Sequence, residues 1–304
     1  MNTSQTKHTD NHLKINMYIS AYLEMCKFKV VALMLFSALV GMLLSYKPSF
    51  DWYKALLSLS GIGLLAGSGG AINHIIDKKI DQKMKRTKNR PLPKGKVTTL
   101  HAICLAATLA ASGTYILWVH TNPLATYLTA AAMIGYAFIY TGILKHTTPQ
   151  NIVIGGINGA LPPLIGWVSL TGEIAPEPLL LVLIIFVWTP PHFWALAIAR
   201  YDDYVKSNVP MLPATHGIKF TKLCILLYAV ITAITTIIPY IINMSGMFYL
   251  IGVTGLNARF LYLATQLYKE PGNKLAMPTF LFSIKYLMLL FLLILVDHMI
   301  SIGV

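Results

Sequence analysis

Residues 54–81 read KALLSLSGIGLLAGSGGAINHIIDKKID, and they join a long apolar stretch directly to a set of oxygen ligands. As a helix, residues 54–77 are long and apolar enough to cross a hydrocarbon core of about 30 Å. Asn73, Asp77 and Asp81 follow one another at intervals of four at the end of this stretch, so in a helix they share one face. The stretch therefore predicts a membrane helix that carries acceptor oxygens to the membrane surface.

These three acceptors suggest a site for a hard cation. Two carboxylates on one helical face repel each other, and negative charge near a helix C-terminus opposes the helix dipole, each at a cost of about a few tenths of a kcal/mol. A bound divalent cation removes both penalties. Mg²⁺ usually takes one or two carboxylates, keeps some waters and bridges to substrate phosphates. We therefore predict Mg²⁺ at Asn73, Asp77 and Asp81; the alternative is a set of interfacial polar residues that end the helix in water.

The opposite charge follows at once, because residues 83–96 read KMKRTKNRPLPKGK. Arg86 and Arg90 carry planar guanidinium groups, which suit phosphate oxygens, and Pro91 and Pro93 stiffen the chain after them. The competing interpretation is that the basic residues set the membrane topology and contact anionic lipid. Next to a predicted Mg²⁺ site, we expect Arg86 and Arg90 to bind diphosphate.

The composition is typical of a polytopic helical membrane protein. The chain has 304 residues, of which 56% are hydrophobic and only 12% are charged, too few charges for a soluble surface. Cys26, Cys104 and Cys224 are far apart, which argues against a thiolate metal site or a disulfide framework. The net charge of +13 reflects lysines and arginines at the ends of apolar spans, so no nucleic-acid partner is expected.

The predicted fold class is all-α: nine transmembrane helices in one bundle around a central cavity. Residues 1–27 are predicted to form a polar cytoplasmic segment without a signal peptide, and residues 28–304 a single transmembrane domain. The predicted spans are residues 28–46, 54–77, 98–119, 124–143, 151–170, 178–199, 222–242, 247–266 and 279–298.

The basic residues predict the orientation of this bundle. They gather before the first span and in the loops after the second, fourth, sixth and eighth. The positive-inside rule then places the N-terminus and these loops in the cytoplasm, with the C-terminus on the opposite side. We expect the active site to face the cytoplasm, because these loops hold nearly all the polar residues that could bind a ligand or take part in a reaction.

A second polar loop follows the sixth span, where residues 199–213 read ARYDDYVKSNVPMLP. Asp202 and Asp203 could complete a second metal or diphosphate half-site that faces the first, or they could belong to a solvated loop. A duplicated four-helix unit plus one extra helix would explain the recurrence of acids and bases.

His192 lies within the sixth span, in WTPPHFWALAI at residues 188–198. An ionisable group at membrane depth is a functional-site hypothesis by default. The alternative is a neutral imidazole bonded to a backbone carbonyl that Pro190 and Pro191 leave free. Asn158, in the apolar fifth span, is likewise either a functional residue or a structural one.

Several segments together resemble a known family. The residues that carry the likeness are NHIIDKKIDQKMKRTKNRPL at 73–92, LKHTTPQNIVIGG at 144–156, GALPPLIGW at 159–167, WTPPHFWALAI at 188–198 and DYVKSNVPMLP at 203–213. From about residue 15 to the last span, the chain resembles the protohaem IX farnesyltransferases, or haem O synthases, of the intramembrane prenyltransferase superfamily. The NxxxDxxxD pattern at 73–81 alone marks only the wider superfamily. The RTxxRPL, PPHFWALAI and DYxxxxVPMLP patterns are more particular, and they favour haem as the acceptor.

The resemblance assigns roles residue by residue. It implies a first Mg²⁺–diphosphate motif, two diphosphate-binding arginines and an aspartate in the second polar loop. His146 and Ser207 depart from the family pattern, the first where many members have a basic residue and the second where a further aspartate would complete the second motif. The implied catalytic residues are Asn73, Asp77, Asp81, Arg86, Arg90 and Asp203; the metal ligands are Asn73, Asp77, Asp81 and Asp203; the substrate-binding residues are Arg86, Arg90, Lys145, Lys206, His192 and Tyr204.

The activity implied is transfer of a farnesyl group from farnesyl diphosphate to a vinyl group of haem B, with Mg²⁺ as cofactor. The implied location is the cytoplasmic (inner) membrane. Besides the lipid bilayer and the two substrates, the resemblance names haem A synthase and terminal oxidase assembly as candidate partners. A quinone-type aromatic prenyltransferase and a transporter are the alternatives.

Overall fold

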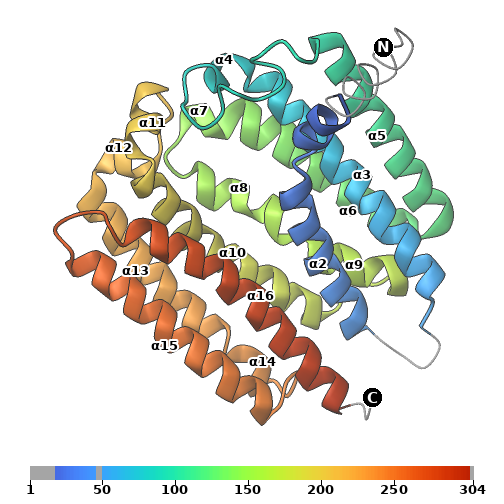
Figure 1. Ribbon diagram of the computed structural model, residues 1–304. Helices are drawn as coiled ribbons and strands as arrows, with labels where there is room; N and C mark the ends of the chain where they lie inside the picture. Colours follow the sequence, from blue (N-terminus) through green and yellow to red (C-terminus); the bar gives the residue numbers. More distant parts are fainter. Residues whose placement is uncertain (1–17, 46–49, 302–304) are drawn as a thin grey trace, which may run out of the picture.

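The computed structural model describes residues 18–45 and 50–301, and every regular element within these ranges is a helix (Figure 1). The all-α class is therefore confirmed. After a short helix at Tyr18–Met25, the helices are α2 (Phe28–Leu44), α3 (Trp52–Ile76), α4 (Lys78–Asp81), α5 (Thr99–His120), α6 (Pro123–Ile134), the π-helix η1 (Gly135–Leu144), α7 (Lys145–Thr147), α8 (Asn151–Ala160), α9 (Pro162–Thr171), α10 (Pro176–Ala199), α11 (Tyr201–Lys206), α12 (Leu212–His216), α13 (Ile218–Thr235), α14 (Ile238–Ile241), α15 (Met247–Lys269) and α16 (Ala276–Ser301).

Eight helical stretches of the described chain are long and apolar enough to cross a membrane. A ninth consists of Tyr18–Met25 and α2, which meet at an angle of 51°. Eight predicted spans are therefore confirmed, and the bent pair supplies the ninth, which begins at Tyr18 rather than at residue 28. The predicted domain boundary after residue 27 stays a prediction. Residues 1–17 of the predicted N-terminal segment lie outside the described part of the chain.

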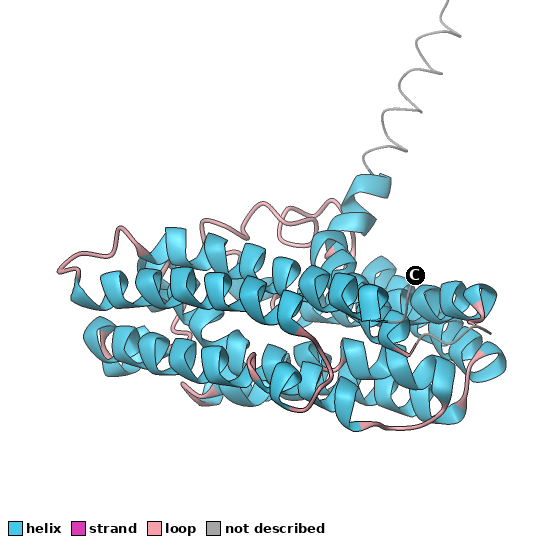
Figure 2. Cartoon of the chain, turned by 90° about the horizontal axis from the view of Figure 1, so that it is seen from below, coloured by secondary structure: helices cyan, strands magenta, loops and turns pink. Residues whose placement is uncertain are grey.

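The helices form two layers when the molecule is seen from below (Figure 2). In the first part of the chain, α3 packs against α5 and α2, and α2 packs against α9. In the second part, α15 packs between α13 and α16. Helix α10 contacts α8 and α9 on one side and α13 and α16 on the other, so it joins the two parts.

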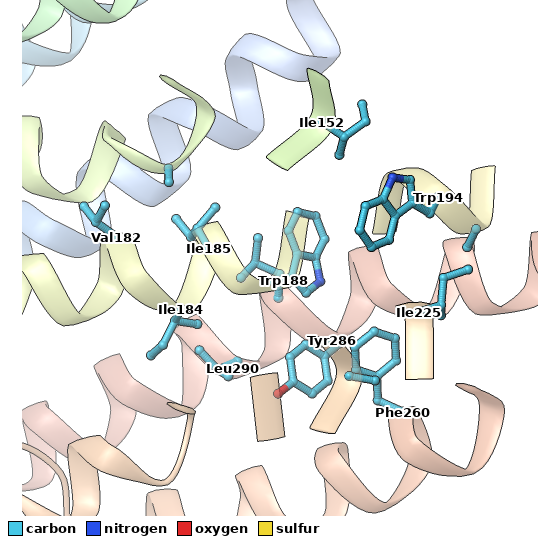
Figure 3. Close-up of a cluster of buried hydrophobic side chains, with 14 of the residues drawn as sticks. Ile152, Val182, Ile184, Ile185, Trp188, Trp194, Ile225, Phe260, Tyr286 and Leu290 are labelled. Atoms are coloured by element: carbon cyan, nitrogen blue, oxygen red, sulfur yellow. The ribbon is translucent and has the colours of Figure 1, made fainter. Parts of the chain in front are cut away.

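Large side chains fill the space between α10, α13, α15 and α16. Trp188 and Trp194 of α10, Phe260 of α15 and Tyr286 of α16 all belong to one buried cluster (Figure 3). Trp194 is 2% exposed and Tyr286 is fully buried. This close packing joins α10, which leads into the second polar loop, to α13, α15 and α16.

Backbones of α2 and α9 approach each other closely because both helices carry glycine at the contact. A Cβ atom on Gly41 would lie 1.9 Å from the carbonyl oxygen of Pro163, and one on Gly166 would lie 2.0 Å from that of Ala38. Small residues allow such contacts between membrane helices. The contact fixes the span that follows the bend at residues 26–27 against the middle of the bundle.

Candidate active site

Three of the four predicted metal ligands lie together where α3 runs into α4. Asn73 is in the last turn of α3, Asp77 is the residue between the two helices, and Asp81 ends α4. The backbone N–H of Asp77 donates to the Asn73 carbonyl at 2.9 Å, and that of Asp81 to the Asp77 carbonyl at 2.8 Å. The helical spacing of four predicted from the sequence is therefore present in the structure, and all three side chains are buried.

The π-helix η1 supplies the facing wall of the site. In an α-helix, position 136 would point about 140° away from position 141 and about 180° away from position 145, but a π-helix bonds residue i to i+5 and has a wider turn. The hydroxyl of Thr141 donates to the Tyr136 carbonyl, five residues earlier, at 2.9 Å. Tyr136, Thr141 and Lys145 consequently contact the same small region around Asn73 and Asp77.

Each acidic ligand has a basic partner. Lys145 Nζ lies 2.6 Å from Asp77 Oδ2, and Arg90 Nη1 lies 2.7 Å from Asp81 Oδ2. The other oxygen of Asp77 is buried and has no hydrogen-bond partner among the described residues. A buried, unpartnered carboxylate oxygen is costly, and a cation at this position would remove that cost. Two carboxylates and an amide are also a suitable hard-oxygen donor set for Mg²⁺.

The two arginines predicted to act as a pair lie in different surroundings. Arg90 is half-buried on Asp81, whereas Arg86 is exposed. Burial raises the pKa of the Tyr204 phenol, and the positive charge of Arg86 opposes that rise. Arg86 is therefore close enough to the second polar loop to act on Tyr204, whereas Arg90 is paired directly with the first acidic motif.

The second polar loop lines a cavity of about 530 Å³ at the end of α10. Its lining includes Lys85 of the first polar loop, so the two loops meet there. Tyr204 is buried, Asp203 is half-buried and Lys206 is exposed. The full lining is Lys85, Ile198, Ala199, Arg200, Tyr201, Asp202, Asp203, Lys206, Asn273 and Met277.

Asp203 does not complete a metal cluster with the first motif. Within residues 18–45 and 50–301, no three His, Cys, Asp or Glu side chains converge as metal ligands would. The assignment of Asp203 to a metal therefore stays a prediction. Its hydrogen bond in the structure is through its backbone, since the Ser207 hydroxyl donates to the Asp203 carbonyl at 2.7 Å.

His192 of α10 lies in an aromatic stack between Trp188 of the same helix and Phe280 of α16. Its ring stacks on Trp188 at 4.3 Å and on Phe280 at 4.6 Å between centroids. Its partner is a hydroxyl rather than a freed carbonyl, because Nδ1 lies 2.7 Å from Ser283 Oγ. Ser283 Oγ already donates its hydrogen to the Phe280 carbonyl at 2.6 Å. It must therefore accept from Nδ1–H, which leaves the lone pair of His192 Nε2 free for another ligand.

Asn158, the other polar residue noted in an apolar span, is half-buried in α8. Its side-chain amide donates to the Gly155 carbonyl at 3.4 Å, a long local bond. A Cβ atom on Gly135 would lie 2.2 Å from Asn158 Oδ1, so the residue packs against the first turn of η1. Within the described chain, its contacts are structural.

Sequence reasoning missed Lys27 and Thr141, which contact Asn73 of the first motif, and Tyr136, which contacts Lys27. Lys27 donates to Asn73 Oδ1 and to the Tyr136 hydroxyl. Thr141 Oγ1 accepts from Asn73 Nδ2 at 3.0 Å. The sequence did hold a signal for Lys27, a basic residue at the entry of the first span. Tyr136 and Thr141 depend on the π-helical turn, which hydrophobic periodicity does not reveal.

Comparison with known proteins establishes the class of this molecule. The UbiA prenyltransferase family matches residues 34–293. A chain solved in work on digeranylgeranylglyceryl phosphate synthase has a TM-score of 0.77 at 24% identity, covering 92% of this chain and 98% of that one. A UbiA homologue from Archaeoglobus fulgidus, solved with GPP and Mg²⁺, has a TM-score of 0.61 at 16% identity, covering 90% and 99%. The fold is that of the intramembrane prenyltransferases, and the chain is an integral membrane enzyme of this class.

Closer relatives identify its branch of that class. The protoheme IX farnesyltransferase of Thioalkalivibrio sulfidiphilus is 54% identical over 277 residues, which are 91% of this chain and 92% of that protein. The protoheme IX farnesyltransferase of Colwellia psychrerythraea is 52% identical over 278 residues, 91% of each chain. The chain belongs to the UbiA prenyltransferase family and, within it, to the protoheme IX farnesyltransferases.

Proposed function

We propose that this protein transfers a farnesyl group from farnesyl diphosphate to a vinyl group of haem B, giving haem O. One observation carries the proposal: Asn73, Asp77 and Asp81 gather at the end of a membrane helix beside Lys145 and Arg90. A site of this kind can hold an anionic leaving group at the surface while its lipid chain stays in the apolar bundle. The names of the close relatives support haem as the acceptor.

Asn73, Asp77 and Asp81 are the residues that would hold Mg²⁺, and Asp203 would belong to a second half-site on the second polar loop. When bound, Mg²⁺ supplies positive charge that stabilises the departing diphosphate. The binding of GPP and Mg²⁺ by the Archaeoglobus fulgidus homologue supports this assignment.

Basic side chains of this protein complete the neutralisation. Arg90 and Lys145 are held beside the acids at 2.7 and 2.6 Å, and the exposed Arg86 lies on the same loop. Charges fixed before the reaction stabilise a developing diphosphate without reorganisation. Breaking the C–O bond then releases diphosphate and leaves an allylic cation.

Aromatic rings next to the site suit this cation. Tyr136 and Tyr140 stack at 5.9 Å between centroids on η1, and Tyr136 contacts Lys27 of the same site. Aromatic faces attract cations and keep water away from them. The haem vinyl group attacks the allylic carbon, water adds to the adjacent carbon and a proton is lost, so that the product is a hydroxyethylfarnesyl substituent.

The cavity at the end of α10 suits the polar edge of haem. In its lining the cations Lys85, Arg200 and Lys206 outnumber the carboxylates Asp202 and Asp203, and cations of this kind pair with carboxylates. Haem carries its two carboxylates on the edge opposite its vinyl groups, so binding them here would direct a vinyl group into the bundle. His192, with its free Nε2 lone pair, is a candidate contact for the porphyrin or its iron, and the buried Tyr204 of the second polar loop is a further candidate.

We also propose an orientation in the membrane and a class of partner. We place the protein in the inner membrane with the polar loops and the N-terminus in the cytoplasm, because the basic residues gather on that side. Haem A synthase or a terminal oxidase assembly factor, which would receive the product, stays a predicted partner.

Product analysis tests the function directly. Membranes that contain the protein are incubated with Mg²⁺, farnesyl diphosphate and either haem B or 4-hydroxybenzoate, and the products are identified by mass. We expect farnesylated haem that carries one added water. A prenylated aromatic acid would identify a quinone-type enzyme instead, and the absence of any prenylated product would leave the transporter alternative.

A further inference from the structure

Lys27 is a cation at the acidic motif without an acidic partner. It lies at the bend between Tyr18–Met25 and α2, in a left-handed conformation with φ of 53°. Its ammonium donates to Asn73 Oδ1 and, at 2.7 Å, to the Tyr136 hydroxyl, and it lies 5.4 Å from the centre of the Tyr136 ring. The ion pairs of the described chain join Arg90 to Asp81 and Lys145 to Asp77, and neither includes Lys27.

The surroundings of Asn73 determine which of its side-chain atoms faces Lys27. Nδ2 donates to Asp77 Oδ2 at 2.9 Å and to Thr141 Oγ1 at 3.0 Å. Both atoms are acceptors here, because the Thr141 hydroxyl already donates its own hydrogen to the Tyr136 carbonyl. Lys27, in contrast, can only donate. Asn73 Oδ1 must therefore point toward Lys27, and the amide cannot be reversed without breaking three hydrogen bonds.

Lys27 thus occupies Asn73 Oδ1, the oxygen that a metal ion bound by Asn73 would need. An ammonium group and a divalent cation repel each other at short range and compete for the same lone pairs. When a cation binds Asn73 Oδ1, the Lys27 ammonium has to find another acceptor. The one strong anion that the proposed function brings to this place is the diphosphate.

We propose that Lys27 is a diphosphate-binding residue of this site: its ammonium group holds Asn73 Oδ1 until the cation arrives and then contacts the diphosphate. This inference rests on the proposed function, because it requires a diphosphate and a divalent cation at the first motif. It also gives the bend at residues 26–27 a role, because Lys27 lies at the bend and its side chain contacts Asn73 at the end of α3.

The competing explanation is that Lys27 only ties the bend to α3 and η1. The two explanations differ in the direction of a measurable effect. A structural tether stabilises the whole site, so its loss weakens metal and diphosphate binding together. A residue that competes with the metal and binds diphosphate has opposite effects on the two ligands.

Binding measurements on the purified full-length protein separate these cases. Mn²⁺ replaces Mg²⁺ as a spectroscopic probe and is titrated without substrate by electron paramagnetic resonance. Inorganic pyrophosphate is then titrated at saturating Mg²⁺ by calorimetry. For Lys27→Met we expect Mn²⁺ to bind several-fold more tightly and pyrophosphate about tenfold more weakly, since a hydrogen bond to a charged group is lost.

Three further variants control the result. Lys29→Met removes an exposed lysine two residues away and should leave both affinities unchanged. Lys27→Arg keeps the charge and should retain most of the pyrophosphate affinity. Lys27→Gln keeps a donor to Asn73 without the charge and serves in place of Lys27→Met if the latter does not fold.

Unchanged pyrophosphate affinity in Lys27→Met would overturn the proposal, and so would a parallel loss of both affinities with a lower Tm. The proposed function fails separately: a wild-type protein that binds Mg²⁺ and pyrophosphate but forms no farnesylated haem would refute the haem reaction, while the comparison of Lys27 variants would still stand.

Discussion

Lys145 Nζ lies 2.6 Å from Asp77 Oδ2, although the two residues are 68 positions apart in the chain. The contact joins the end of η1 to the junction of α3 and α4, and the same Asp77 oxygen also accepts from the Asn73 amide. The other Asp77 oxygen is buried without a partner among the described residues. Asp77 thus has one oxygen held by this protein and one available to a cation.

Replacement of Lys145 by Met tests whether its charge serves the leaving group. We expect kcat/KM for farnesyl diphosphate to fall by about 100-fold, because a fixed charge near the developing diphosphate is lost. The measurement is the initial rate of haem O formation in membranes with matched protein content. Lys145→Arg should recover part of the rate. Wild-type kinetics in Lys145→Met would show that its ion pair with Asp77 is only structural.

The acidic residues themselves should be indispensable. For Asp77→Ala and Asp81→Ala we expect turnover to fall by at least about 100-fold, because each removes a carboxylate from the proposed cation site. Chelation of divalent cations with EDTA should reduce the wild type to a similar level, and added Mg²⁺ should restore only the wild type. Asp51→Ala, at the opposite end of the same helix, is the control and should keep its activity. Turnover near wild type in either motif variant would remove the metal hypothesis.

Arg90 differs from Lys145 in the shape of its charged group. Its guanidinium is held on Asp81 at 2.7 Å and keeps further donors that can face phosphate oxygens in parallel. In Arg90→Lys a point charge replaces this planar fork, so we expect KM for farnesyl diphosphate to rise by about tenfold, equivalent to about 1.4 kcal/mol. Steady-state kinetics at fixed haem B measure the change. An unaltered KM would mean that charge alone suffices at this position.

The sequence predicted the fold and the first motif because both depend on local patterns. Long apolar stretches give the spans, and a spacing of four places Asn73, Asp77 and Asp81 on one face. The first span is the exception, because no apolar pattern marks the bend at residues 26–27, where Lys27 adopts a left-handed conformation.

The facing wall of the site could not be predicted in the same way. Tyr136 and Thr141 approach the motif only because η1 is π-helical, and in an α-helix they would point in different directions. The separation of Arg86 from Arg90 is also a tertiary effect: Arg90 finds a buried carboxylate, whereas Arg86 lies in the exposed part of the loop.

His192→Ala tests the link between the aromatic stack and haem. Because Ser283 accepts from Nδ1–H, Nε2 of His192 keeps a lone pair suited to iron. We expect the variant to bind haem B more weakly and to shift its Soret band, measured by absorbance titration of the purified protein. His146→Ala, at an exposed position, should bind as the wild type does. Unaltered spectra and turnover in His192→Ala would assign the residue to packing between Trp188 and Phe280.

The contact between α2 and α9 should contribute to the stability of the protein, although it lies outside the site. A Cβ atom on Gly41 would lie 1.9 Å from the Pro163 carbonyl oxygen, and backbone on both sides cannot move without separating the helices. Gly41→Ala should therefore destabilise the protein by about 1–3 kcal/mol, as other overpacked contacts do. Thermal unfolding in detergent measures the change as a lower Tm. Gly159→Ala is the matched control, because nothing lies within 4 Å of its added Cβ. Equal Tm values for the two variants would show that α2 and α9 can separate freely, and that Lys27 is not held in position by this contact.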